Sequence, residues 1–253
     1  MRLVKAWWMT LGMFTIVPVP PVWDEDAKPW VVPLLPLAGL FPGLFAAGAA
    51  WLAAQTGFSR LLESVLLLLA WHVGTGFIHA DGLMDTSDAL FSRASREKRL
   101  AILKDPHVGS FAVISLSVVL LLQLAALETL TSQTYILWPW LAIPVLSRSW
   151  ASLAVLLTPK VLTDGYASQF RSTQKIRFIL IPLAALAGLP ILTFSLGGWA
   201  GLAVASLLSV AAASAWMTLQ RSFGGISGDL AGFILVISET AALLAWAMIP
   251  EVF

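Results

Sequence analysis

Long apolar runs separated by short polar loops dominate this chain. Seven runs are long enough to cross the roughly 30 Å hydrocarbon core of a bilayer at about 1.5 Å per residue. They cover residues 32–54, 61–80, 109–127, 135–157, 178–196, 199–217 and 230–250. The pattern predicts an all-α, polytopic membrane protein, a bundle of about seven transmembrane helices.

Two regions near the N-terminus depart from plain straight spans. The apolar run at 4–17 follows two basic residues, ends at a cluster of prolines and is not followed by a small-residue cleavage site. We therefore expect an interfacial or re-entrant helix that the protein keeps. The 32–54 run should be bent or broken at its prolines. No repeat or linker divides the chain, so residues 1–253 are expected to form a single membrane-embedded domain.

The composition supports this class and excludes others. The chain is 58% hydrophobic and 11% charged, and a single soluble core cannot bury that much apolar surface. A net charge of +1 without a basic block gives no indication of nucleic-acid binding. The absence of Cys excludes disulfides and thiolate chemistry. Many Trp residues fall near predicted segment ends, as in an interfacial aromatic belt: Trp7, Trp8, Trp23, Trp30, Trp51, Trp138, Trp140 and Trp199.

Basic residues are distributed unevenly between the loops. With a cytoplasmic N-terminus, the inner loops are residues 1–31, 81–108, 158–177 and 218–229. These loops hold 13 of the 15 Lys and Arg residues, as the positive-inside rule requires. The loops with unusual polar chemistry lie on the same side. A transporter would instead need polar groups along a path between both faces, so the pattern favours a membrane enzyme with an active site facing the cytoplasm.

Three carboxylates follow directly on the second apolar run. Asp81, Asp85 and Asp88 lie within roughly 40° of one another on a helical face, at ~100° per residue. Such acids repel one another unless a cation lies between them, and Mg²⁺ prefers carboxylate oxygens, often shared with substrate phosphates. The alternative is an acidic first turn of a surface helix. With only 14 acids in 253 residues, three on one stripe favour a metal site.

A basic segment comes after the acids. Guanidinium groups bind phosphate oxygens in pairs and Lys acts as a point charge, so the combination suits a diphosphate substrate. The alternative is that these residues only enforce topology and contact lipid headgroups; it is the better explanation for Arg96, Lys98 and Arg99. Lys104 and Asp105 also permit a local structural role before Pro106. The segment contains Arg93, Arg96, Lys98, Arg99, Lys104 and Asp105.

Charged residues also occur inside predicted spans. Arg148 lies in the fourth span, where an unpaired charge costs several kcal/mol. It should pair with Glu239 of the last span or with an anionic ligand, and the sequence does not separate an ion pair from a substrate clamp. His72 is expected to be a hydrogen-bonded packing residue.

The last inner loop reads Gly224-Gly-Ile-Ser-Gly-Asp229. Its backbone N–H groups could bind phosphate, which would make Gly225, Ser227 and Asp229 substrate-binding residues. Ser227 or Asp229 could equally cap the helix that begins near residue 230.

These motifs together resemble a known family. The chain reads Thr75-Gly-Phe-Ile-His-Ala-Asp-Gly-Leu-Met-Asp-Thr-Ser-Asp-Ala-Leu-Phe91. This motif resembles a pattern of the cobalamin synthase family, adenosylcobinamide-GDP ribazoletransferase, which is T-G-G-x-H-x-D-G-L-x-D-T-x-D-G-x-F. The similarity continues, in order and spacing, through Phe14–Pro20, Pro36–Gly39, Arg99–Gly109, Ser147-Arg148 and Gly224–Gly232. The chain departs from the family pattern at Ile16, Phe77, Ala101 and Val236.

The resemblance implies a reaction and a role for each motif. The family joins adenosylcobinamide-GDP to α-ribazole, or its 5′-phosphate, and releases GMP with Mg²⁺ at the bacterial cytoplasmic membrane. The three acids would hold Mg²⁺ on the diphosphate, and Lys104 and Arg148 would neutralise charge on the leaving GMP. His79 or an acid would accept the proton of the attacking hydroxyl. The catalytic candidates are His79, Asp81, Asp85, Lys104, Asp105 and Arg148; the substrate-binding candidates are Arg93, Gly225, Ser227, Asp229 and Glu239.

Two other functions remain open at this stage. CDP-alcohol phosphotransferases carry a similar acid stripe after Asp-Gly, and a corrinoid or cation transporter could place its acids in a vestibule. The expected partners are the two substrates and the lipid bilayer, with no nucleic acid. The sequence leaves open a homo-oligomer or a complex with other cobalamin-assembly enzymes.

Overall fold

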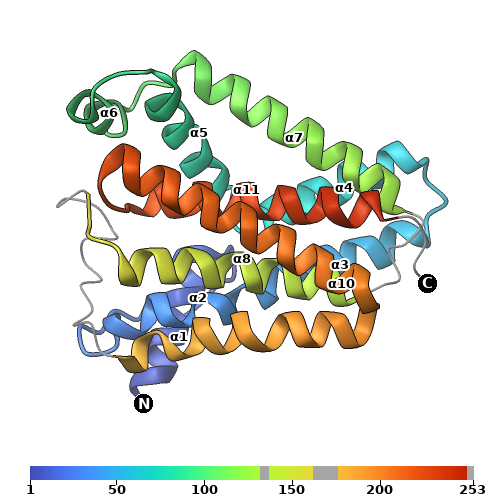
Figure 1. Ribbon diagram of the computed structural model, residues 1–253. Helices are drawn as coiled ribbons and strands as arrows, with labels where there is room; N and C mark the ends of the chain where they lie inside the picture. Colours follow the sequence, from blue (N-terminus) through green and yellow to red (C-terminus); the bar gives the residue numbers. More distant parts are fainter. Residues whose placement is uncertain (132–136, 162–175, 250–253) are drawn as a thin grey trace.

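The fold is a bundle of helices without a sheet (Figure 1). The computed structural model describes residues 1–131, 137–161 and 176–249. Within these ranges no strand occurs, and residues 160 and 226 form an isolated bridge. The elements are α1 (Arg2–Phe14), η1 (Lys28–Trp30), α2 (Val31–Ala38), α3 (Leu40–Ala54), α4 (Arg60–Val73), α5 (Ile78–Phe91), α6 (Arg96–Ile102), α7 (Ser110–Leu130), α8 (Leu137–Leu157), η3 (Ile176–Phe178), α10 (Leu180–Phe223) and α11 (Gly228–Met248).

The described helices fit a polytopic membrane protein. Five are long and apolar enough to cross a bilayer, or six if the bent pair of α4 and α5 counts as one span. In this count α2 and α3 form one span, and α10 is counted once although it covers two of the predicted segments. Helices suit this environment because they satisfy their backbone hydrogen bonds internally. The predicted all-α membrane fold is confirmed.

The first predicted span is broken, as its prolines indicate. α2 ends at Ala38, and Gly39 separates it from α3. A side chain at Gly39 would lie only 2.6 Å from the carbonyl oxygen of Pro144 in α8. The break therefore occurs where the chain packs directly against the backbone of a neighbouring helix.

The second predicted span, 61–80, ends earlier than expected. α4 stops at Val73, and α5 continues at 86° to it. Gly76 and Phe77 have φ angles of 60° and 61°, a left-handed conformation, at the point where the chain turns by about a right angle. The predicted single span is therefore two helices, and the acids lie on the second one, α5, which runs at about a right angle to α4.

The two predicted segments 178–196 and 199–217 form a helical hairpin. α10 contains one non-helical residue, Gly198, with φ 55° and ψ −142°. Figure 1 shows the two halves of α10 folding back on each other at this point. Gly201 lies against the backbone carbonyl of Thr193, where no side chain would fit.

Aromatic residues fill the core at one end of the bundle. Trp140 is fully buried, and its ring centroid lies 5.9 Å from that of Trp71 and 5.3 Å from that of Trp246. Trp140 therefore packs inside the bundle and does not face lipid, because the three rings pack on one another. Trp51 and Trp199 are exposed, as an interfacial belt requires.

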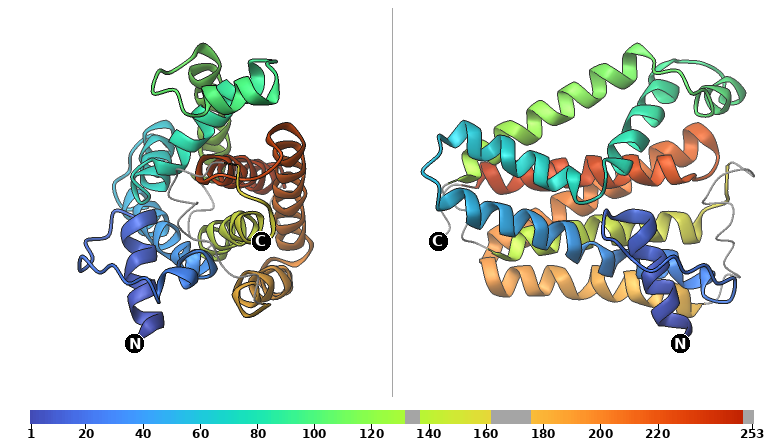
Figure 2. Two further views of the ribbon diagram at one scale, coloured as in Figure 1. Left: turned by 90° about the vertical axis from the view of Figure 1, so that its left-hand side faces the viewer. Right: turned by 180° about the vertical axis from the view of Figure 1, so that it is seen from behind.

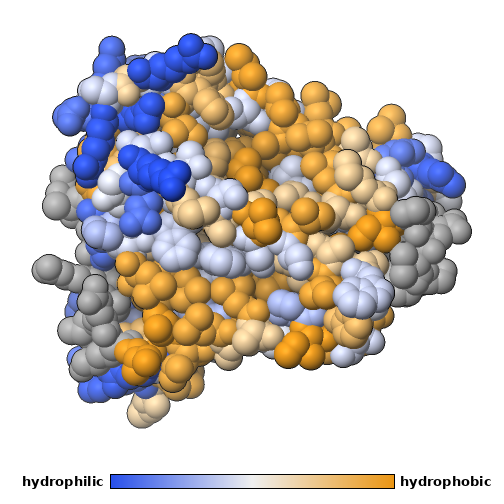
Figure 3. Space-filling view, in the orientation of Figure 1, coloured by the Kyte–Doolittle hydropathy of each residue, from blue (hydrophilic) through white to orange (hydrophobic). Residues whose placement is uncertain are grey.

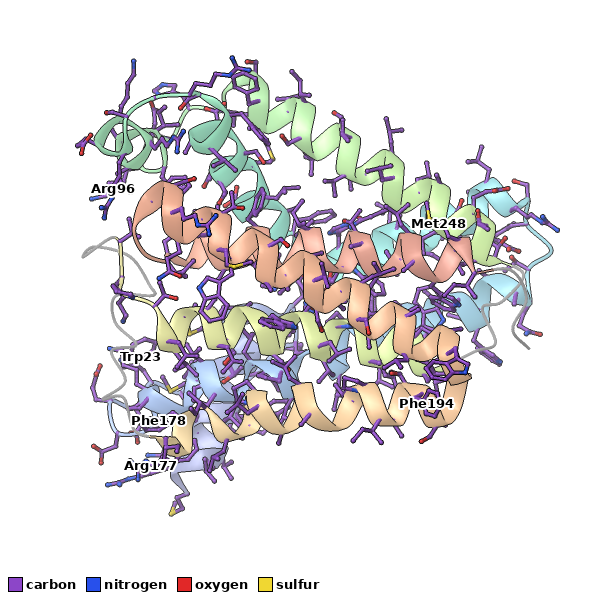
Figure 4. The ribbon with its side chains drawn as sticks, viewed as in Figure 1. Trp23, Arg96, Arg177, Phe178, Phe194 and Met248 are labelled. Atoms are coloured by element: carbon purple, nitrogen blue, oxygen red, sulfur yellow. The ribbon has the colours of Figure 1, made fainter. Side chains whose placement is uncertain are left out.

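Polar residues gather at the other end, which we call the polar end. Figure 3 shows hydrophilic residues concentrated over α5, α6 and their loops, whereas the side of the bundle is mainly apolar. Arg96 and Arg177 lie at this end, and Phe194 and Met248 lie at the opposite end (Figure 4). The end-on view in Figure 2 looks onto the polar end. The described parts of the loops that the sequence groups on one side therefore lie at one end of the bundle; residues 162–175 of the 158–177 loop are outside the described residues.

Candidate active site

The site forms where α5 crosses the first turn of α11. A side chain at Gly82 would lie 2.8 Å from the carbonyl oxygen and 3.1 Å from the Cα atom of Asp229. On the facing helix, a side chain at Gly232 would contact the backbone of His79 and Gly82 at 3.4–3.5 Å. Small residues at such a crossing let two helix backbones approach closely. The glycines of the two sequence motifs therefore dock the motifs on each other.

This crossing adds a fourth carboxylate to the predicted acid stripe. Asp85 is partly buried and experiences the negative charges of Asp81, Asp229 and Asp88. Asp229, in turn, experiences the charge of Asp81. The sequence suggested substrate binding or capping for Asp229; the structure brings it beside the acids. We call Asp81, Asp85, Asp88 and Asp229 the acid row.

The donor set of the acid row fits Mg²⁺ that arrives with a substrate. All four side chains offer carboxylate oxygens, the ligands that hard divalent cations prefer. Within the part of the chain that the structure describes, however, no three His, Asp or Glu side chains are grouped closely enough to hold a metal ion alone. Mg²⁺ keeps several waters and commonly binds one or two carboxylates together with substrate phosphates. The acid row therefore suits a cation shared with a diphosphate.

Asp88 also has a structural environment of its own. Its carboxylate fills the space where a side chain at Gly109 would project, just before α7 begins. A negative charge is favourable at the N-terminus of a helix, because the backbone N–H groups there carry partial positive charge. Asp88 therefore has a stabilising role that is independent of any metal.

His79 lies on the same helix as the acids but is buried. It is 8% exposed, and its Nε2 atom has no hydrogen-bond partner among the described residues. Its ring stacks on Phe14 of α1, with centroids 6.4 Å apart and planes at 17°. A cavity of about 380 Å³ reaches both His79 and Asp229 between α1, α2, α5, α8 and α11. The sequence predicts only an interfacial or re-entrant helix for residues 4–17; the structure also places Phe14, at the end of α1, against His79 in the site.

Arg148 and Glu239 form the predicted ion pair. Arg148 Nη1 lies 2.7 Å from Glu239 Oε1, and both side chains are at most 4% exposed. The hydroxyl of Ser147 and the indole N–H of Trp71 also donate to this carboxylate, each at 2.8 Å. The carboxylate of Glu239 thus receives three hydrogen bonds from the protein, which compensates its burial.

His72 belongs to a second buried polar chain. It donates to Gln123 at 2.7 Å, and Gln123 donates to Thr240 at 2.9 Å. This chain links α4, α7 and α11. The prediction of a packing role for His72 is confirmed.

The α10–α11 turn is shaped by local contacts. Ser227 caps α11 by accepting a hydrogen bond from the backbone N–H of Leu230 at 3.2 Å, which confirms the capping alternative. Gly225 lies against the carbonyl of Pro159, where a side chain would not fit. Gly224, with φ 75°, lies directly beneath the guanidinium of Arg96. The sequence favoured a purely topological role for Arg96, and only the tertiary structure places it on this turn.

The remaining candidates lie in exposed loops at the polar end. Arg93 has a positive φ of 54° just after α5, and Lys104 lies after α6. Asp105 accepts hydrogen bonds from the backbone N–H of His107 at 3.0 Å and from its ring Nδ1 at 2.6 Å. These two bonds hold the pKa of Asp105 below its usual value. Asp105 is therefore a weak proton acceptor in this conformation.

Comparisons with known proteins agree with the motifs. The family model of cobalamin-5-phosphate synthase matches residues 6–247. Adenosylcobinamide-GDP ribazoletransferase of Clostridium botulinum (strain Alaska E43 / Type E3) is 32% identical over 245 residues, covering 96% of this chain and 97% of the relative. The same enzyme of Clostridium perfringens (strain SM101 / Type A) is 32% identical over 248 residues, 97% and 98% of the two chains.

A relative from another genus gives the same result. Adenosylcobinamide-GDP ribazoletransferase of Geobacillus thermodenitrificans (strain NG80-2) is 33% identical over 256 residues, 97% of this chain and 95% of the relative. No solved structure matches the chain. Because the matches extend over nearly the whole length, the protein is an enzyme of the transferase class and belongs to the cobalamin-5-phosphate synthase family.

Proposed function

We propose that the protein is a Mg²⁺-dependent adenosylcobinamide-GDP ribazoletransferase that acts on α-ribazole or its 5′-phosphate. The observation that carries the proposal is the α5–α11 crossing, where Gly82 and Gly232 bring Asp229 next to the acids of α5, beside a cavity of small-molecule size. Family membership supplies the donor and acceptor named for the relatives. The expected product is adenosylcobalamin or its 5′-phosphate.

The reaction is a displacement at phosphorus. The ribazole hydroxyl oxygen forms a bond to the phosphorus on the cobinamide side of the diphosphate, and the anhydride bond to GMP breaks. The hydroxyl proton passes to His79 or to a carboxylate of the acid row. When bound, Mg²⁺ would neutralise charge on the diphosphate oxygens, and Asp81, Asp85, Asp88 and Asp229 are the residues that would hold it.

Basic residues at the polar end are proposed to neutralise the leaving GMP. Arg93 and Lys104 occupy exposed loops there, and Arg96 lies on the α10–α11 turn beside the first turn of α11. The burial of Arg148 and its pairing with Glu239 favour a role in holding the bundle rather than a direct contact with phosphate. We further propose that the polar end faces the bacterial cytoplasm, because it carries most of the basic residues.

The test is GMP release by purified protein in nanodiscs containing adenosylcobinamide-GDP, α-ribazole phosphate and Mg²⁺. Asp85→Asn should abolish release, and chelation of Mg²⁺ should do the same in the wild type. Asp26→Asn is the matched control, because Asp26 forms an exposed ion pair with Arg2 and such pairs contribute little. Release that persists without Mg²⁺, or in Asp85→Asn, would contradict the assignment of the acid row.

The same preparation separates the alternatives. A CDP-alcohol phosphotransferase would release CMP from CDP-diacylglycerol and would not respond to cobinamides. A transporter would move corrinoid or cation across sealed vesicles without releasing GMP. Either result, with no GMP release from folded protein, would replace the proposed reaction.

A further inference from the structure

We infer that the cavity between α1, α5, α8 and α11 binds the aromatic base of the acceptor, a benzimidazole-type nucleoside. The inference rests on the proposed function and assigns a place to one of its two substrates. The cavity of about 380 Å³ lies at the lower end of the range of roughly 300–1,000 Å³ that is usual for small-molecule pockets. This size suits a nucleoside and is too small for a corrinoid.

The chemistry of the lining favours a flat and largely apolar base. Apart from His79 and Asp229, the cavity is lined by apolar side chains and glycines, among them Phe14, Leu35 and Val155. A guanine ring carries several hydrogen-bonding groups along its edges, and most would be left unpaired against these walls. A benzimidazole has only one bare ring nitrogen once the sugar is attached, so its hydrogen-bonding demand is small.

His79 supplies the matching donor. Its Nε2 atom is buried without a partner among the described residues, which is costly unless a ligand completes the hydrogen bond. In the Nε2-protonated tautomer, and with the imidazole turned so that Nε2 faces the cavity, it can donate to the bare nitrogen of the base while the ring stays stacked on Phe14. A lipid acyl chain would also fit the apolar walls but would leave His79 Nε2 without a hydrogen bond.

The position of the cavity agrees with the proposed displacement. Asp229 lines the cavity and also belongs to the acid row, so a nucleoside with its base inside would present its sugar toward the acids. With His79 engaged by the base, the proton of the attacking hydroxyl passes to a carboxylate of the acid row. His79 then acts as a substrate-binding residue, and the apolar wall excludes the guanine of the donor.

The experiment measures binding of α-ribazole to the full-length protein by isothermal titration, without Mg²⁺ and without the GDP-linked donor. Val155→Phe, which narrows the cavity, should weaken binding at least about tenfold. Leu157→Phe on the same helix is the matched control, because Leu157 is exposed and does not line the cavity. His79→Phe should cost about tenfold, the value of one hydrogen bond, and His79→Gln should recover most of the loss. Thermal unfolding of each variant verifies its fold.

Three results would overturn the inference. The first is equal displacement of α-ribazole by guanosine, and the second is unchanged α-ribazole binding in folded Val155→Phe. The third is a lipid that co-purifies with the wild type and is lost in Val155→Phe, while both proteins bind α-ribazole equally. GMP release distinguishes this failure from failure of the proposed function. If release continues with the same KM for α-ribazole in wild type and Val155→Phe, the cavity assignment is wrong and the reaction stands. If α-ribazole binds in the cavity but folded protein releases no GMP, the reaction is wrong.

Discussion

Substitution of Gly82 by Ala tests whether the acid row depends on the α5–α11 crossing. The added Cβ atom would lie 2.8 Å from the carbonyl oxygen of Asp229, about 0.6 Å inside an ordinary contact of 3.4 Å. The obstacle is backbone, so one helix must move away from the other. Overpacking of this kind costs about 1–3 kcal/mol, and the helix propensity of Ala returns up to about 1 kcal/mol. We expect a net loss of stability of about 0–3 kcal/mol.

The effect on activity should be larger than the effect on stability. A misplacement of about 1 Å can cost roughly a hundredfold in rate, so a shift of about 0.6 Å between Asp229 and the other acids should lower GMP release at least about tenfold. The Mg²⁺ concentration for half-maximal rate should also rise. Gly48→Ala is the control, because nothing lies within 4 Å of its added Cβ atom. Wild-type rate and Mg²⁺ dependence in folded Gly82→Ala protein would refute the reasoning.

Three further predictions concern other parts of the structure. Glu239→Gln should destabilise the protein in detergent by about 3–5 kcal/mol, because it leaves Arg148 buried without its counter-charge; a change below 1 kcal/mol in chemical unfolding would contradict this. Phe77→Gly should raise the thermal unfolding temperature, since a left-handed backbone costs a non-glycine residue about 1–2 kcal/mol, whereas Phe77→Ala keeps the strain and should lower it. His107→Ala should raise the pKa of Asp105 toward its usual value, measured by carboxyl NMR. Because that pKa is lowered in the fold, the interaction stabilises the protein at neutral pH and loses its effect as the pH falls through it; an unchanged titration would contradict the assignment.

Features that depend on short-range pattern could be predicted from the amino-acid sequence. Apolar length located the membrane helices, the prolines predicted the break between α2 and α3, and helical spacing placed Asp81, Asp85 and Asp88 on one helix. The cost of a buried charge was enough to predict the pair of Arg148 and Glu239. These inferences succeed because each rests on the energy of a residue in a bilayer or on the geometry of a single helix.

The contacts between distant segments could not be predicted and follow from the packing of the helices. The turn at Gly76 and Phe77 directs α5 away from α4, and apolar length cannot reveal it because the run continues through the bend. The approach of Asp229 to the acids depends on two glycines on different helices, and the cavity beside His79 depends on Phe14, at the end of α1, stacking on His79 of α5. Such contacts are set by which backbones can approach each other, a property of pairs of helices that no single segment of sequence contains.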